Sequence, residues 1–309
     1  MQKTAFLFAG QGAQVVGMGK DLAENFDTAR RLFTDANQVV GYDLATICWQ
    51  GPEAELTKTE HAQPGIYLVS WIAMQLLLER CPNLRFEAAA GLSLGEFTAL
   101  AAAGSISFQD GLKTVRQRGR FMQEACDVTR GGMAAIVGLD ETATRAACDQ
   151  AGVAIANLNC PGQIVISGEA DRLAAACEYA KARGAKRALP LTVAGAYHSP
   201  LMASAQPKLE AALTQAVIRS PTVPVMSNVT AAPHEAPAEI GRRLVEQVTA
   251  PVRWEDSMRY LLAEGFTRFI ELGPGTALAG FMKRIDKSAQ VWSIGDAVGL
   301  ETAVNALAA

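Results

Sequence analysis

The sequence predicts an α/β fold with a smaller βαββαβ unit inserted into it, on three observations. A buried strand, Thr4 to Phe8, runs into Gly10-Gln11-Gly12 and precedes helical patterns up to about Glu79, which is α/β order. A second short apolar run leads into a Gly-x-Ser-x-Gly pentapeptide and then a helical run. From about Thr129, strand and helix patterns follow one another in the order β-α-β-β-α-β, which is the ferredoxin-like order.

Length and composition narrow the class of protein. A chain of 309 residues favours one large domain with an insertion, or two domains. Half of the residues are apolar, 19% are charged and the net charge is −3, so we expect no nucleic-acid surface. The six cysteines form no C-x-x-C pair and the three histidines are far apart, so we expect no metal site and reduced thiols. No apolar run is long enough for a signal peptide or a membrane span, so we expect a cytoplasmic protein that does not bind a membrane.

The pentapeptide Gly91-Leu92-Ser93-Leu94-Gly95 lies between an apolar run, Phe86 to Ala90, and a helical run, Glu96 to Ala103. In this context Gly-x-Ser-x-Gly forms a nucleophile elbow, a sharp turn that projects the serine hydroxyl while the glycines permit close approach. The helix after it supplies N–H groups and a positive dipole end. Ser93 is therefore the candidate nucleophile, although such pentapeptides also occur by chance as plain turns.

Two helices are expected next to this serine. Gly104 can end the first, and Ser107 can cap a second helix from Phe108 to about Cys126. The second helix places on one face Leu112, Val115, Gly119, Met122 and Cys126.

The inserted unit and the return to the larger unit follow in order. The unit is predicted to contain strands at 133–139, 153–159, 163–168 and 187–193, and helices at 141–150 and 171–183. The larger pattern then resumes with a strand at 224–228, helices at 240–248 and 254–263, and a strand at 268–271 before Gly273-Pro274-Gly275. The predicted boundaries are therefore 1–128 and 194–309 for the large subdomain and 129–193 for the small one.

A serine hydroxyl needs a base, and histidine is the side chain whose ordinary pKa suits that role. His61 lies in a polar segment and His234 in a loop rich in Pro, Ala and Glu. His198 lies where the chain leaves the inserted unit and rejoins the large one, and such junctions line clefts. His198 is the candidate base, although a lone histidine is often structural or solvated.

A lipase or esterase places an acid between its serine and histidine to orient the imidazole. Five aspartates lie in that interval, and none stands out by its local context: Asp110, Asp127, Asp140, Asp149 and Asp171. A backbone carbonyl can orient the imidazole instead. The glycine spacing after Gly10 does not give a dinucleotide or P-loop motif. That loop can instead supply the Gln11 N–H to an oxyanion, together with the N–H of Leu94.

Eight segments in chain order resemble the malonyl-CoA:acyl-carrier-protein transacylases: FAGQGAQ, GLSLGEF, RGRFMQEA, NLNCPGQIVISG, AKRALPL, AYHSPLM, EQVTAPVRW and ELGPG. The resemblance implies an α/β-hydrolase-like large subdomain and a ferredoxin-like small one. It also implies a catalytic dyad of Ser93 and His198, with an oxyanion hole from the N–H groups of Gln11 and Leu94. The backbone carbonyl of Gln247 would orient the histidine.

For substrate binding, the resemblance implies that Arg118 grips the free carboxylate of the malonyl group, while Asn159 lies in a matching block near the site. A helical wheel alone does not choose this arginine, because Arg116 and Arg118 lie at opposite borders of the apolar face and Arg120 is more exposed. The chemistry favours a guanidinium, which can bind a carboxylate with two hydrogen bonds.

The resemblance implies ping-pong transfer of malonyl from malonyl-CoA, through a malonyl-serine, to the phosphopantetheine thiol of acyl carrier protein for fatty acid elongation. We expect a monomer without a bound cofactor. The family commonly has histidine before the nucleophile and this chain has Leu92, so its acyl preference can differ; Tyr197 is a second position expected to touch the acyl chain. A serine hydrolase or thioesterase, a non-catalytic carrier-docking subunit, a polyketide-pathway enzyme and the malonyl-loading subunit of a malonate decarboxylase remain alternatives.

Overall fold

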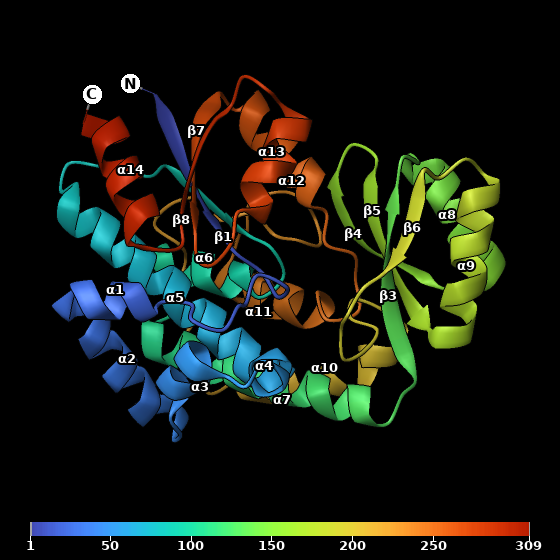
Figure 1. Cartoon of the computed structure of the whole chain (residues 1–309), viewed down its shortest axis with the longest axis horizontal. Helices are drawn as coiled ribbons and strands as arrows, with labels where there is room; N and C mark the ends of the chain where they lie inside the picture. The colour runs from blue at the N-terminus through green and yellow to red at the C-terminus, as the bar shows by residue number, and fades with distance from the viewer. Residues whose placement is uncertain (1, 309) are drawn as a thin grey trace.

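The computed structural model describes residues 2–308, which form two sheets in two lobes (Figure 1). The sheet of the large lobe has the order β2-β1-β7-β8, and every strand in it is parallel to its neighbours. Its strands are Lys3–Phe8 (β1), Ala88–Gly91 (β2), Phe266–Leu272 (β7) and Gln290–Ile294 (β8). Phe8 pairs with both Gly91 and Leu272, so the carboxyl ends of three strands meet at one edge.

Helices cover both faces of this sheet, as a parallel sheet requires. On one face α5 (Thr59–Arg80) is buried along most of its length, and α6 (Gly95–Ala102) and α7 (Phe108–Asp127) pack near it. On the other face α12 (Trp254–Ala263) and α13 (Ala277–Ile285) enclose a second core. The remaining helices are α1 (Lys20–Asn25), α2 (Asp27–Val40), α3 (Leu44–Gln50), α4 (Glu53–Thr57), η1 (Pro200–Ala205), α10 (Gln206–Leu213), α11 (Pro237–Glu246) and α14 (Ala297–Ala308).

The small lobe contains an antiparallel sheet with the order β4-β5-β3-β6 and its own apolar core. Figure 1 shows α8 and α9 together on the outer side of this sheet. The elements are β3 (Gly131–Val137), α8 (Glu141–Ala151), β4 (Ala154–Cys160), β5 (Gln163–Glu169), α9 (Ala170–Ala182) and β6 (Arg187–Pro190). They follow the predicted order, although β6 ends three residues before the predicted limit at 193.

The two lobes are joined through β4. The N–H of Val252 donates to the carbonyl of Ala156 at 2.8 Å, and the N–H of Leu158 donates to the carbonyl of Val252 at 2.9 Å. Backbone bonds between the lobes therefore fix the edge of the small sheet beside the large one.

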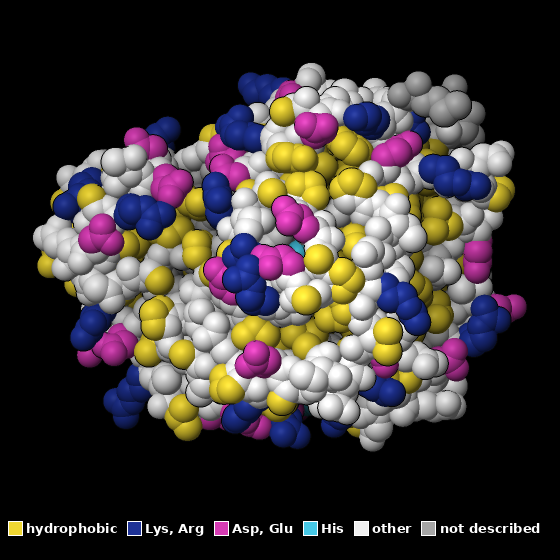
Figure 2. Space-filling model, turned by 180° about the vertical axis from the view of Figure 1, so that it is seen from behind, with side chains coloured by type: hydrophobic (Ala, Val, Ile, Leu, Met, Phe, Trp, Pro, Cys, Tyr) yellow, Lys and Arg dark blue, Asp and Glu magenta, His cyan; other side chains and the backbone are white. Residues whose placement is uncertain are grey.

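Seen from behind, the small lobe projects at the left, and side chains of both charge signs are interspersed over that face (Figure 2).

The strand predicted at 224–228 is not a regular strand in the structure. Val225 forms a single bridge with Ala89 and Met226 a single bridge with Pro233. Pro224 has no N–H to donate, and the chain turns at once, since the N–H of Ala231 bonds to the carbonyl of Ser227 at 2.9 Å. The prediction was wrong in type here, but it placed this segment correctly beside the large sheet.

Candidate active site

Ser93 lies in a tight turn between β2 and α6, as the elbow motif predicts. Its φ is +54°, which costs energy for a residue with a side chain and persists only where the surroundings hold it. A Cβ on Gly91 would lie 1.9 Å from the carbonyl carbon of Gly95, and one on Gly95 would lie 2.3 Å from the carbonyl oxygen of Phe8. Both glycines are therefore required by close backbone approach.

The backbone of Ser93 is held by Asn228, which the sequence did not point out. The N–H of Ser93 donates to Asn228 Oδ1 at 2.7 Å, and Asn228 Nδ2 donates to the carbonyl of Gly91 at 2.8 Å. The side chain thus spans the turn and satisfies two buried backbone groups. The sequence indicated Asn228 only by its position at the end of the predicted strand 224–228, where it would lie beside the carboxyl ends of the other strands.

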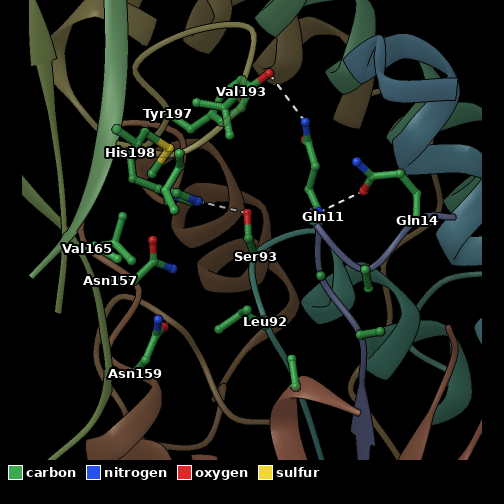
Figure 3. A pocket seen from close by; sticks show the side chains of 18 of the residues that line it. Gln11, Gln14, Leu92, Ser93, Asn157, Asn159, Val165, Val193, Tyr197 and His198 are labelled. Atoms are coloured by element: carbon green, nitrogen blue, oxygen red, sulfur yellow. Dashed lines mark hydrogen bonds between the residues drawn. The ribbon is translucent and has the colours of Figure 1, made fainter. Parts of the chain in front are cut away.

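The Ser93 hydroxyl is 2.8 Å from Nε2 of His198, although the two residues are 105 positions apart (Figure 3). His198 is 4% exposed and also has a positive φ, +56°. Its Nδ1 lies 2.9 Å from the carbonyl of Gln247 and 3.2 Å from that of Ala250. Carbonyl oxygens only accept hydrogen bonds, so Nδ1 carries the proton and Nε2 presents its lone pair to Ser93.

Of the other two histidines, neither meets the serine. His61 Nδ1 bonds to the carbonyl of Glu55, and His234 Nε2 lies 2.7 Å from Glu96 Oε1. Burial, reinforced by the positive charge of Arg118, lowers the pKa of His198 to about 4, while its bonds to two carbonyls oppose the shift. His198 is therefore neutral at neutral pH and able to accept a proton.

The structure separates the three arginines that the helical wheel left equivalent. Arg118 is 1% exposed, and its Nη2 donates to Ser93 Oγ at 3.1 Å and to Gln247 Oε1 at 2.9 Å. Its Nη1 donates to Gln63 Oε1 at 2.7 Å. Arg116 lies over the ring of Tyr42, and Arg120 bonds to Glu124. Only Arg118 of the three contacts the candidate nucleophile.

Arg118 is buried because α7 packs closely against α5. A Cβ on the adjacent Gly119 would lie 2.5 Å from the carbonyl oxygen of Thr59, so the glycine sets this approach. Burial lowers the pKa of Arg118 to about 10, while the negative charge of Glu96 opposes the shift. The guanidinium keeps its charge at neutral pH and lies where a negative group attached to Ser93 would meet it.

Ser93 and His198 line a cavity of about 390 Å³ between the two lobes. In Figure 3, Asn157 and Asn159 from β4 lie across this cavity from Gln11. Asn159 is 5% exposed, and its Oδ1 has no hydrogen-bond partner within residues 2–308. The side-chain Nε2 of Gln11 donates to Thr59 Oγ1 at 3.1 Å and to the hydroxyl of Tyr197 at 3.3 Å.

The backbone N–H groups of Gln11 and Leu94 are also near this site. Leu94 directly follows Ser93, and Gln11 lies in the loop after β1. This loop approaches the elbow closely, because a Cβ on the neighbouring Gly10 would lie 2.4 Å from the carbonyl oxygen of Leu92. Within the described part of the chain neither N–H donates to a backbone carbonyl. The structure thus places all seven predicted site residues in or beside this site, although they come from segments spread over most of the sequence.

Comparison with known proteins identifies the family. The model of the acyl transferase domain matches residues 5–301. The malonyl CoA-acyl carrier protein transacylase of Bacillus subtilis (strain 168) is 44% identical over 312 residues, which cover 99% of this chain and 98% of the relative. The chain belongs to the malonyl CoA-acyl carrier protein transacylase family. This confirms the resemblance found in the sequence.

Solved structures of this transacylase family have the same fold. The acyl-carrier-protein-S-malonyltransferase from Bartonella henselae is 38% identical with a TM-score of 0.94, covering 99% of this chain and 100% of that one. A malonyl-transacylase in complex with its type II PKS acyl-carrier protein is 37% identical with a TM-score of 0.94, covering 98% of this chain and 99% of that one. The mixed α/β architecture is therefore shared along nearly the whole chain.

Two kinds of feature are absent from residues 2–308 of this family member. No helix among those residues is both long and apolar enough to span a bilayer. The same residues contain no cluster of three or more His, Cys, Asp or Glu side chains suited to holding a metal ion.

Besides Asn228, three residues that contact the site were not predicted from the sequence: Gln63, Ala250 and Glu96. Of these three, only Glu96 was indicated by the sequence, through its position directly after the elbow pentapeptide.

Proposed function

We propose that this acyltransferase moves the malonyl group of malonyl-CoA onto the phosphopantetheine thiol of an acyl carrier protein, by way of a malonyl ester on Ser93. The observation that carries the proposal is the buried guanidinium of Arg118, 3.1 Å from the Ser93 hydroxyl. A buried cation beside a nucleophile favours an acyl group that brings its own negative charge. The malonyl group has such a charge in its free carboxylate.

In the first half-reaction, His198 Nε2 accepts the Ser93 proton as Oγ attacks the thioester carbonyl carbon. The carbonyl oxygen becomes an oxyanion, and the backbone N–H groups of Gln11 and Leu94 donate to it. The C–S bond then breaks, and the CoA sulfur leaves with the proton held by His198. The carbonyl of Gln247 keeps the imidazole in the required tautomer throughout, since it accepts from Nδ1 at 2.9 Å.

In the second half-reaction, the phosphopantetheine thiol enters the same cavity and gives its proton to His198. Its sulfur attacks the ester carbonyl carbon, the oxyanion forms again, and the C–O bond to Ser93 breaks as His198 returns the proton to Oγ. Arg118 binds the malonyl carboxylate in both halves. Asn159 places a carboxamide oxygen, which has no partner within residues 2–308, at the cavity wall, where it can accept a hydrogen bond from malonyl-CoA or from the phosphopantetheine arm.

The two lobes supply different parts of this site. We assign the nucleophile, base and arginine to an α/β-hydrolase-like subdomain, 1–128 and 194–309, and Asn159 to a ferredoxin-like subdomain, 129–193. The donor is malonyl-CoA, and the acceptor carries its own phosphopantetheine, so the reaction needs no resident cofactor. We further propose a cytoplasmic monomer that supplies fatty acid elongation.

A two-step labelling experiment tests the proposal. The protein is incubated with radiolabelled malonyl-CoA, separated from free label, and then mixed with holo acyl carrier protein. We expect a stable acyl-enzyme that discharges onto the carrier, and no adduct on the Ser93→Ala variant. Prompt release of free malonate instead would assign the site to a hydrolase.

The Arg118→Met variant tests the carboxylate contact. A hydrogen bond to a charged group contributes roughly 1.5–3 kcal/mol, so we expect malonyl loading to fall about 10- to 100-fold per bond lost. Acetyl-CoA has no free carboxylate, so acetyl loading should stay equal or rise. An equal fall for both acyl groups would remove the assignment of Arg118.

A further inference from the structure

Glu96, in the first turn of α6, is a fully buried carboxylate with a set of donors around it. Its Oε2 accepts from Gln247 Nε2 at 2.6 Å and from the backbone N–H of Asn228 at 3.1 Å. Its Oε1 lies 2.7 Å from Nε2 of His234. Both Glu96 and the His234 side chain are shielded from solvent, at 0% and 1% exposure. A carboxylate this deep requires all of these bonds.

The bond to Gln247 determines which way that amide faces. Glu96 only accepts hydrogen bonds, so it holds the NH₂ end of the Gln247 side chain, which also donates to the carbonyl of Ser93 at 3.0 Å. The oxygen end then faces Arg118, whose Nη2 donates to it at 2.9 Å. Arginine only donates, so the amide connects an obligate acceptor to an obligate donor and has one acceptable orientation.

We propose that Glu96 is a positioning residue that orients the Gln247 amide and through it holds Arg118 at Ser93, so that it contributes to the preference for an acyl group with a free carboxylate. The inference rests on the proposed role of Arg118. The Glu96 side chain does not line the cavity, since its hydrogen bonds go to Gln247, Asn228 and His234. Its role is to keep the side chain that meets the substrate in place.

The charges agree with this arrangement. The Glu96 carboxylate stabilises the charged form of Arg118 against the burial that lowers its pKa. The His234 ring faces this carboxylate with its Nε2, while its Nδ1 has no hydrogen-bond partner within residues 2–308. Glu96 therefore acts on Arg118 in two ways, through the Gln247 amide and through its negative charge.

The Glu96→Gln variant tests the proposal. It removes the charge and can turn an NH₂ group toward the Gln247 amide, so the NH₂ end of that amide loses its one charged acceptor and keeps only the neutral contacts to the Ser93 carbonyl and Asn228 Oδ1. We expect the ratio of malonyl to acetyl loading rates on Ser93, measured by mass spectrometry, to fall by about tenfold or more, the effect of losing one charged hydrogen bond. Glu87→Gln is the matched control, because Glu87 bonds to the backbone N–H of Thr4 away from the site, and its ratio should not change.

A double-mutant cycle separates positioning from general support of the fold. In an Arg118→Met background, Glu96→Gln should have no further effect on the loading ratio, because the side chain that it positions is gone. An equal fall in malonyl and acetyl loading in the single variant, an unchanged ratio, or a ratio effect that persists without Arg118 would each overturn the proposal. If Arg118→Met alone leaves the ratio unchanged, the proposed function of Arg118 fails instead.

Exchange of the two groups covers the case in which Glu96→Gln does not fold. Gln247→Glu places two carboxylates opposite each other, whereas Glu96→Gln with Gln247→Glu restores one donor facing one acceptor. We expect the double variant to recover malonyl loading relative to Gln247→Glu alone. Absence of recovery in a folded double variant would contradict the pairing on which the inference depends.

Discussion

Replacement of Asn228 by alanine should destabilise the whole protein as well as the site. The Asn228 side chain is the partner of two buried backbone groups, the N–H of Ser93 at 2.7 Å and the carbonyl of Gly91 at 2.8 Å. Asn228 is 1% exposed, and its Oδ1 also accepts from Gln247 Nε2 at 3.3 Å. Alanine leaves the two backbone groups buried and unpaired, in a turn whose Ser93 φ is already +54°.

The magnitude follows from the two orphaned groups. Each unpaired buried polar group costs about 1–3 kcal/mol, so Asn228→Ala should lower the free energy of unfolding by about 2–6 kcal/mol. This is a large part of the 5–15 kcal/mol, roughly, that folded domains have in total. Acylation should also slow by about 100-fold, because a displacement of about 1 Å between reacting groups has that effect.

Urea denaturation followed by circular dichroism measures the first effect, and the rate of malonyl adduct formation on Ser93 measures the second. The control is Asn25→Ala, because Asn25 is exposed and donates to the Asp21 carbonyl; we expect a change below about 0.5 kcal/mol. A loss of less than about 1 kcal/mol in Asn228→Ala, at an unchanged m-value, would show that Asn228 does not support the turn.

Two other predictions concern the elbow and the base. Gly91→Ala should prevent cooperative folding, because its Cβ would lie 1.9 Å from the Gly95 carbonyl carbon; a normal thermal transition by circular dichroism would refute this close approach. Ser93 loading should stay constant from neutral pH down toward about 4, where His198 becomes protonated and stops accepting the serine proton. In Arg118→Met the pKa of His198 should rise, because a nearby positive charge is lost, so the fall in acetyl loading should move to higher pH; an unmoved acid limb would contradict this coupling.

Local pattern was enough to predict much of the fold. Apolar periodicity and the Ser107 cap predicted the helix from residue 108, and the structure has Phe108–Asp127 with the Ser107 hydroxyl accepting from the N–H of Asp110. The segment 224–228 was harder, because its strand-like composition is overridden by Pro224 and by the turn that follows. The predicted elements ended at Gly275, so β8, α13 and α14 come from the structure alone.

The chain's local signals predicted the elbow at Ser93, the order of elements in the small lobe, part of the order in the large lobe and, through eight ordered segments, the family. Those signals act over a few residues, since helix faces, caps and glycine turns depend on near neighbours. The choice of Arg118 over Arg116 and Arg120, and the bonds from Asn228 and Glu96, depend on side chains more than twenty positions apart that meet at the ends of parallel strands. A helical wheel gives the direction of a side chain but not the group that it meets, so these contacts appear only once the helices and strands are packed together.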